Sequence, residues 1–233
     1  MSLPWYIDPD KIDGTNENGA LVAKNIREDD SVAEAVFQYG VNINSEYVPE
    51  DVINRFSQTG MKMIDEVNAM EKDLIIDLGC GFNPFVKYIK NCIGADVLPY
   101  KDINIQSDFA HTPFIDDCAD VCLCLTGQFF RFINNEKALT EIRRIAKDGC
   151  IIYCRTPKQK FRKLKKKILG TRRANDALLA QKMGEIYGFE IRTELEVEIP
   201  AYTVCQTCLQ KHTKAYLKTI PTQHYHWTWT VRK

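Results

Sequence analysis

The sequence lacks a long hydrophobic run, a signal-peptide pattern and a net charge. No apolar run approaches the ~20 residues of a membrane span, and no signal peptide opens the chain. The 31 basic and 31 acidic residues cancel, which excludes a global electrostatic attraction to nucleic acid or membrane. Internal repeats are absent, and so are low-complexity tracts outside one basic stretch. These absences predict a globular cytoplasmic protein.

The cysteines are odd in number, and most of them lie inside apolar runs. The chain has nine, four of which fall in "ADVCLCL" and "GCIIYC". Buried thiols in strands behave as small hydrophobic side chains, and none of these stands in an obviously basic, exposed setting. The pattern predicts free thiols in a reducing compartment rather than a disulfide scaffold or a thiol enzyme.

Short apolar runs alternate with helical patterns from residue 74 onward. Fully apolar strands between helices are typical of a parallel sheet that is covered on both faces. Two stretches near the C-terminus instead alternate apolar with polar residues, which is typical of strands with one wet face. They predict an antiparallel pair added to a parallel sheet. The expected strands are "LIIDL", "CIGADV", "INIQ", "ADVCLCLT", "CIIYC", "FEIRTELEVEI" and "HYHWTWTV".

Helices are expected on both sides of this sheet pattern, and the start of the chain differs from the rest. Residues 1–30 are acidic and rich in Asn, Asp and Gly, which predicts a loose arm. The expected helices are "SVAEAVFQYG", residues 48–70 with an interruption at Gly60, "NPFVKYIKN", "NEKALTEIRRIAKDG" with Gly149 as its stop, and residues 174–187.

Two glycines follow the first apolar strand, in "DLIIDLGCGFNP". Gly79 and Gly81 lack a Cβ, so the backbone of this turn can approach a ligand closely. Asn83 stands where some nucleotide-binding turns have a third glycine, and asparagine tolerates the left-handed region. Asp77 lies inside the strand, where an unpaired charge is costly, so it needs a partner such as a ligand's ammonium group. Asp96 ends the next apolar run, where a carboxylate can accept both hydroxyls of a ribose.

The order of four segments resembles the class I S-adenosylmethionine-dependent methyltransferases, in particular the small-molecule type. The segments are "DLIIDLGCGFNP", "GADV", "SDFAHTPFIDDCADVCLCLTGQFF" and "ALTEIRRIAKDGCIIY". The resemblance covers about residues 50–200. It implies an α/β, Rossmann-like, mostly parallel seven-stranded sheet with an antiparallel C-terminal strand and helices on both faces. It also implies S-adenosylmethionine as the cofactor.

The resemblance assigns roles residue by residue. The glycine turn lies under the methionine part of the cofactor, Asp96 holds the ribose hydroxyls, and Asp108 accepts from the adenine amino group. The residues implied to bind the cofactor are Asp77, Gly79, Cys80, Gly81, Asn83, Asp96, Val97, Asp108, Phe109, Leu125 and Thr126. The residues expected to face the acceptor are Gln128, Phe129 and Phe130, with His111 as the histidine nearest in sequence to the predicted mouth.

The chain departs from the family pattern between the second and third strands. "LPYKD" leaves about five residues there, too few for a helical crossover of a dozen or more, so the helix is lost or the third strand is displaced. The expected organisation is an arm and helix at 1–48 that partly cover the active site, followed by a methyltransferase domain at 49–233. That domain includes the basic segment 158–173 and an insertion at about 201–222.

Methyl transfer needs alignment and exclusion of water rather than a covalent nucleophile, so no catalytic residue is named. The expected function is methyl transfer from S-adenosylmethionine to an unidentified acceptor, in the first place a small molecule. The basic segment 158–173 holds nine basic residues and no acid. It either packs as an ordinary exposed helix or contacts an anionic acceptor such as nucleic acid. A non-catalytic cofactor-binding module of the same fold is a further alternative.

Two other interpretations fit the sequence less well. Cys205, Cys208 and His212 resemble half of a zinc site, but a second tight pair is absent, so no metal is expected. A nicotinamide-dependent oxidoreductase would have a fuller Gly-x-Gly-x-x-Gly turn, and Pro84 stands at its third glycine. The oligomeric state and the identity of the acceptor do not follow from the sequence.

Overall fold

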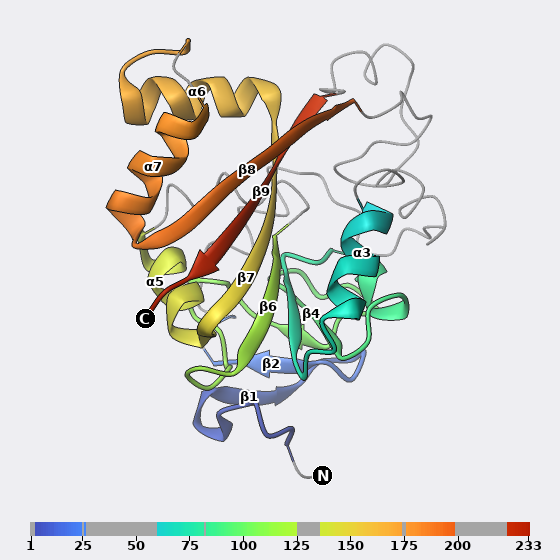
Figure 1. The fold of residues 1–233 in the computed structure, drawn as a ribbon. Helices are drawn as coiled ribbons and strands as arrows, with labels where there is room; N and C mark the ends of the chain where they lie inside the picture. Colours follow the sequence, from blue (N-terminus) through green and yellow to red (C-terminus); the bar gives the residue numbers. More distant parts are fainter. Residues whose placement is uncertain are drawn as a thin grey trace, which may run out of the picture.

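The computed structural model describes residues 3–24, 26, 60–81, 83–124, 136–173, 176–198 and 223–233 (Figure 1). Its strands form one sheet in the order β1-β2-β5-β4-β3-β6-β7-β9-β8. The strands are β1 (Ile12–Thr15), β2 (Leu21–Ala23), β3 (Ile75–Leu78), β4 (Cys92–Asp96), β5 (Ile105–Gln106), β6 (Ala119–Cys124), β7 (Ala146–Pro157), β8 (Phe189–Glu198) and β9 (Gln223–Val231). The helices are η1 (Pro9–Lys11), α3 (Gly60–Ala69), η2 (Pro84–Lys87), α5 (Glu136–Ile145), α6 (Lys158–Leu169) and α7 (Asp176–Tyr187).

The sheet is mostly parallel, as the sequence predicted. Neighbouring strands from β2 through β5, β4, β3 and β6 to β7 all run in the same direction. The C-terminal strand β9 is antiparallel to both β7 and β8. The seven expected strands correspond to β3–β9, and the described sheet has nine because β1 and β2 extend it beyond β5.

The expectation of a loose N-terminal arm is wrong for residues 3–24. These residues form η1 and an antiparallel hairpin, and β2 pairs in parallel with β5 through Leu21 and Ile105. Ile7 forms a bridge with Phe114, and both side chains are buried. Burial of a few scattered apolar side chains therefore outweighs the acidic composition of this segment.

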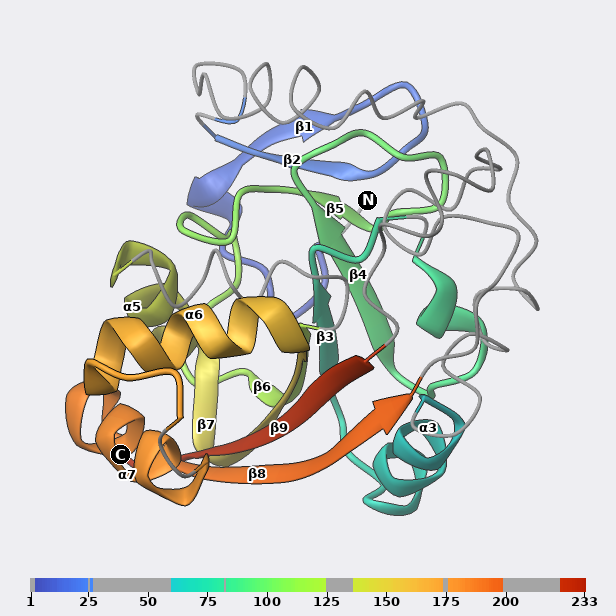
Figure 2. The same cartoon turned by 90° about the horizontal axis from the view of Figure 1, so that it is seen from above.

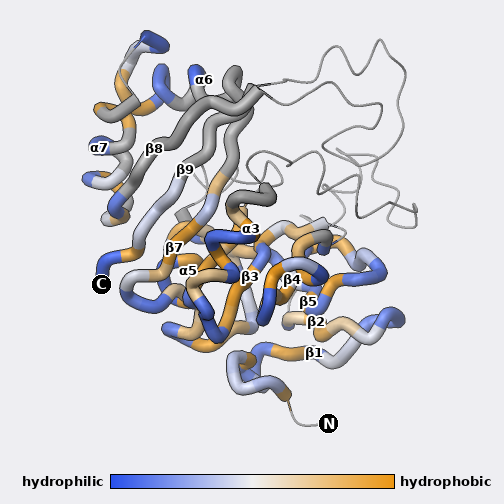
Figure 3. Tube along the Cα trace, turned by 45° about the vertical axis from the view of Figure 1, so that its right-hand side comes forward, coloured by the Kyte–Doolittle hydropathy of each residue, from blue (hydrophilic) through white to orange (hydrophobic). Residues whose placement is uncertain are grey.

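Alternate residues of the central strands bury against helices on opposite faces. On one face, α3 contributes Met63, Ile64 and Val67 to a cluster with Ile75 and Val121. The other face packs against α5 and forms a larger cluster. That cluster includes Ile76, Leu78, Ala95, Cys122, Cys124, Leu139, Ile142, Ile145 and Ile152. Figure 3 shows hydrophobic residues gathered in the central strands. Helices thus cover both faces, as the apolar strand patterns predicted.

Several element boundaries differ from the sequence-based expectation. The helix expected over "NPFVKYIKN" is only the four-residue η2. Residues 97–104, between β4 and β5, contain no helix, which fits the short connection. β7 begins directly after α5, so Gly149, with a φ of 77°, lies within the strand and does not end the helix. The helix expected over 31–40 and residues 48–59 of the next helix lie outside the described residues. None of the described helices has the length and apolar content to cross a membrane.

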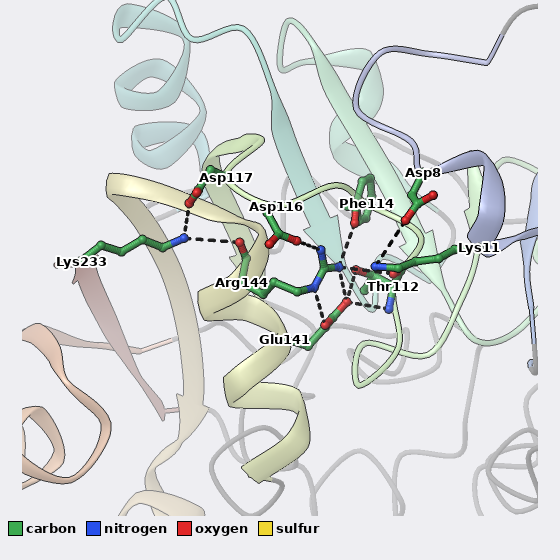
Figure 4. Close-up of polar contacts among 9 residues, drawn as sticks. All are labelled: Asp8, Lys11, Thr112, Phe114, Asp116, Asp117, Glu141, Arg144 and Lys233. Carbon is green, nitrogen blue, oxygen red and sulfur yellow. Dashed lines mark hydrogen bonds and ion pairs between the residues drawn. The ribbon is translucent and has the colours of Figure 1, made fainter.

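Arg144 on α5 joins the helix to the loop that follows β5 (Figure 4). Its Nη1 lies 2.5 Å from the Asp116 Oδ1, and its Nη2 donates to the Phe114 carbonyl at 2.8 Å. Its Nε and Nη2 both donate to Glu141, at 2.9 and 2.6 Å. Glu141 also accepts from the Thr112 backbone N–H and hydroxyl, at 2.9 and 2.7 Å. Burial alone would raise the pKa of Glu141, but the hydrogen bonds from Arg144 and Thr112 lower it.

Replacing Arg144 should destabilise the fold, because it leaves the half-buried Glu141 without its guanidinium. We expect Arg144→Ala to lower the free energy of unfolding by about 1–3 kcal/mol in urea denaturation. The control is Asp116→Asn, which removes a 73% exposed partner of the same guanidinium and should change the stability little. Equal losses in the two variants would contradict the central role of the Arg144–Glu141 pair.

Candidate functional site

The turn after β3 takes up the left-handed conformation three times in five residues. Gly79, Gly81 and Asn83 have φ angles of 71°, 58° and 53°. The backbone N–H groups of Gly79 and Cys80 both donate to the Ala95 carbonyl, at 2.8 and 3.2 Å, which fixes the turn to the end of β4. Asn83 therefore occupies the left-handed position that the sequence predicted for it.

Asn83 fixes the far side of the turn with its side chain, which is only 1% exposed. The Asn83 Nδ2 donates to the Asp102 carbonyl at 2.8 Å and to the Asn104 Oδ1 at 3.0 Å. A Cβ on Gly94 of β4 would lie 2.2 Å from the Asn83 Oδ1, so only glycine leaves room for this side chain. Gly94 and Asn104 were not predicted from the sequence, although a glycine inside an apolar strand is a known sign of a close approach.

Asp96 ends β4 and turns its carboxylate toward the glycine turn. Its Oδ2 accepts from the Gly81 N–H at 2.8 Å, and its Oδ1 accepts from the Leu98 N–H at 2.9 Å. Burial raises the pKa of Asp96 to about 6, although the hydrogen bonds from Leu98 and Gly81 counteract part of this effect. A carboxylate has about four acceptor positions, so both oxygens can still accept from a ligand hydroxyl.

Asp77 of β3 is completely buried, and neither of its carboxylate oxygens has a hydrogen-bond partner among the described residues. Burial, and then the negative charge of Asp96, raise the pKa of Asp77 to about 8. Burial and the charge of Asp77 in turn raise the pKa of the neighbouring Cys92 thiol. A buried carboxyl without a partner is costly, and a cationic ligand group would remove that cost.

The segment after β5 completes this edge of the sheet. The Ser107 backbone N–H donates to the Asp96 carbonyl at 2.9 Å, and the buried Ser107 hydroxyl has no partner among the described residues. The Asp108 Oδ1 accepts from the Ala110 N–H at 2.7 Å. Phe109 packs against the core, whereas His111 is exposed. Ser107 was missed from the sequence, because a lone serine after a strand carries no signal.

The structure thus gathers Asp77, Gly81, Asp96 and Ser107 where three neighbouring parallel strands end. Val97 lies beside them, half-buried, and its carbonyl accepts from the Gln106 side chain at 3.1 Å. Other expected site residues lie outside the described residues: Leu125, Thr126, Gln128, Phe129 and Phe130. The disfavoured zinc candidates Cys205, Cys208 and His212 also lie outside them. Within the described part of the chain, no cluster of three metal-ligating side chains is present.

Residues 76–154 match the family model of the methyltransferase domain. This stretch runs from β3 through the glycine turn, β4, β5 and β6 into β7, so it contains every described residue of the site. No curated protein sequence matches the chain.

Solved structures that are similar to this chain are distant in sequence. One is the methyltransferase in a complex with the Trm112 methyltransferase activator from Haloferax volcanii, with 17% identity and a TM-score of 0.51. That comparison covers 89% of this chain and 98% of the other. Another is an S-adenosylmethionine-dependent methyltransferase from Archaeoglobus fulgidus, with 15% identity, a TM-score of 0.48, and coverage of 78% of this chain and 94% of the other.

The domain match and the strand order confirm the class that the sequence resembled. The fold is that of the class I S-adenosylmethionine-dependent methyltransferases, S-adenosylmethionine is the cofactor, and methyl transfer is the class of reaction.

The described residues fit this cofactor on two observations. A Cβ added at Gly81 would meet nothing within 4 Å, so the turn faces open space. Beside it, the unpartnered Asp77 carboxyl matches the charge of an ammonium group, and Asp96 can accept from ribose hydroxyls. When bound, the cofactor supplies an activated methyl group, and these residues would bind and orient it.

The buried Asp77 should give the stability of the ligand-free protein a distinctive pH dependence. Between pH 6 and 8 the folded state retains the Asp77 proton, whereas the unfolded state has lost it. Stability should therefore fall as the pH rises, by up to about 1.4 kcal/mol per pH unit in urea denaturation. Asp96, with a pKa of about 6, contributes to the pH dependence of stability mainly below pH 6.

Asp77→Asn should remove this fall between pH 6 and 8, because asparagine does not titrate. Asp73→Asn is the control: it removes an exposed carboxylate just before β3 and should retain the wild-type slope. Identical pH profiles for the wild type and Asp77→Asn would contradict a neutral, buried Asp77.

Gly94→Ala should displace the Asn83 side chain and distort the turn. We expect a loss of about 1–3 kcal/mol in the free energy of unfolding, as for other overpacked sites. The same change in an Asn83→Ala background should cost less, because the atom that the new Cβ meets is gone. A double-mutant cycle measures this coupling, and strictly additive losses would contradict the contact.

Proposed function

We propose that the protein binds S-adenosylmethionine in the bend between Gly79, Gly81 and Asp96 and transfers its methyl group to an acceptor at the same edge of the sheet. The observation that carries the proposal is a pair of buried carboxyls beside an open glycine turn. One of them, Asp96, holds the turn through the Gly81 N–H, and the other, Asp77, has no partner among the described residues.

The residues proposed to bind the cofactor divide by the part of it that they would contact. Asp77 would bind the ammonium group, the backbone of the glycine turn would lie along the methionine part, and Asp96 would accept from the ribose. The segment at Ser107, Asp108 and Phe109 would line the adenine side. In this arrangement the protein contributes orientation and exclusion of water, which together can lower such a barrier by roughly 7–11 kcal/mol.

The acceptor is the open part of the proposal. The resemblance to the small-molecule type favours a small acceptor at Gln128, Phe129 and Phe130. A specific observation favours an anionic macromolecule instead: the basic helix α6 follows β7 at the carboxyl edge of the sheet. The exposed His111 stays a candidate for the acceptor side, without an assigned catalytic role.

Gly81→Ala should block cofactor binding by placing a methyl group in the space that the cofactor would occupy. The matched control is Gly149→Ala, because Gly149 also has a positive φ, 77°, and a Cβ there would likewise meet nothing within 4 Å. Gly149 lies toward the opposite end of β7, away from the glycine turn. Both variants should lose about 1–2 kcal/mol of stability from the strained backbone.

Isothermal titration with S-adenosylmethionine and its demethylated product separates the two variants. We expect at least about tenfold weaker binding for Gly81→Ala, which corresponds to roughly 1.4 kcal/mol, and no change for Gly149→Ala. A wild-type protein that binds neither compound at millimolar concentration would overturn the proposal. Binding without turnover on a broad acceptor panel would favour a non-catalytic module.

A further inference from the structure

The helix α6 carries an unusual excess of positive charge. Residues 149–175 contain no acid, and nine of the sixteen residues from 158 to 173 are Lys or Arg. The exposed basic side chains on α6 and in the turn that follows it include Arg162, Lys166, Arg172 and Arg173. We refer to these four as the α6 basic face.

No member of the α6 basic face has a described acidic partner, a property that it shares with single exposed lysines such as Lys24 and Lys72, but here the cations lie close together in the sequence. Arg144, Lys147, Lys182, Arg232 and Lys233 each form an ion pair with Asp or Glu. The net charge of the whole chain is zero, so the positive electrostatic potential is local to α6 and does not come from a general excess of basic residues.

The helix begins at the edge of the sheet that carries the cofactor turn. β6 and β7 run in parallel and reach the pair Cys124–Cys154, and β7 continues three residues further to Pro157, where α6 follows directly. Only β6 separates β7 from β3, so β7 lies roughly 10 Å across the sheet from the strand that precedes Gly79, and its last three residues carry the start of α6 roughly 10 Å further along the strand direction. Figure 2 looks down on this edge and shows α6 lying across the end of β7.

We infer that the α6 basic face binds the phosphodiester backbone of a nucleic acid and so presents that nucleic acid as the acceptor for methyl transfer. That the nucleic acid is the methyl acceptor rests on the proposed function. That it binds to α6 rests on the exposed cations of the α6 basic face.

The length of the array favours a polymer over a small metabolite. From Arg162 to the end of the helix at Leu169 the axis rises by about 10 Å, and Arg172 and Arg173 extend the array further. A small anion can neutralise only one or two of these charges at once. A nucleic-acid strand carries a phosphate every few ångströms and can contact all of them.

A membrane surface fits this part of the molecule less well. Membrane-surface helices insert an apolar face, but Ile168 and Leu169 of α6 already pack against the hydrophobic core. Contact through phosphates requires no exposed aromatic platform, so binding by the α6 basic face should depend little on sequence.

The test compares two triple variants of the full-length protein with the same net charge. Arg162→Gln, Lys166→Gln and Arg172→Gln together neutralise three members of the α6 basic face. Lys24→Gln, Lys72→Gln and Lys90→Gln together neutralise three exposed lysines elsewhere on the surface. The probes are a 20-nucleotide single-stranded RNA, a 20-base-pair DNA duplex and vesicles with 30% phosphatidylserine, with binding followed by fluorescence anisotropy or co-sedimentation over a range of salt.

We expect the α6 triple variant to bind RNA or DNA at least tenfold more weakly and to lose about two to three from the slope of log K against log salt. The control triple variant should match the wild type. Equal binding by the two triple variants, or no binding of either nucleic acid by the wild type, would overturn the inference. Binding of vesicles alone, lost in the α6 variant, would assign the surface to lipid instead.

Cofactor titration and methyl transfer keep this inference distinguishable from the proposed function. Both triple variants should bind S-adenosylmethionine as the wild type does, and transfer of a radiolabelled methyl group to RNA or DNA should fall only in the α6 variant. If the wild type binds nucleic acid through α6 but not the cofactor, the proposed function fails alone. If it binds the cofactor and transfers no label to either nucleic acid, the acceptor assignment fails alone.

Discussion

The hydrogen bond between the Gly81 N–H and the Asp96 carboxylate, at 2.8 Å, is the contact on which the candidate site depends. It joins the bend after β3 to the end of β4, two points separated by fifteen residues. The Gly79 and Cys80 N–H groups also bind the Ala95 carbonyl, but the Gly81–Asp96 bond alone joins the turn to a side chain that can accept from a ligand. Because the same carboxylate also accepts from the Leu98 N–H, the start of the next connection is fixed at the same time.

Buried polar groups around this contact differ in how many hydrogen bonds their side chains form. Asn83 donates twice, to Asp102 and Asn104, and so supports the turn, although its Oδ1 has no partner among the described residues. Asp77 and the Ser107 hydroxyl are equally buried but have no partner among the described residues. Unsatisfied polar groups are rare in folded proteins, so their concentration beside an open glycine turn is a physical sign of a ligand.

The sequence predicted the centre of the fold well because that part is encoded locally. The runs "LIIDL" and "ADVCLCLT" are apolar on both faces, and they became the buried strands β3 and β6. Asp96 was predicted correctly at the end of β4, since a single acid after an apolar run marks the tip of a strand. The Arg144 contacts to Thr112 and Phe114 were not predicted, because partners about thirty residues apart leave no local pattern. The hairpin of β1 and β2 was missed because its apolar run, residues 20–23, is short and the residues around it are rich in Asn, Asp and Gly.

The pairing of β2 with β5 has a consequence for how the chain assembles. Leu21 meets Ile105 more than eighty residues later in the sequence, and Ile7 meets Phe114 at a still greater separation. During synthesis, the hairpin of β1 and β2 therefore has no partner in the main sheet until β5, more than eighty residues later, has been made. Early synthesis and late docking place the N-terminal hairpin among the last parts of the sheet to form, since distant pairings carry the largest loop-closure cost.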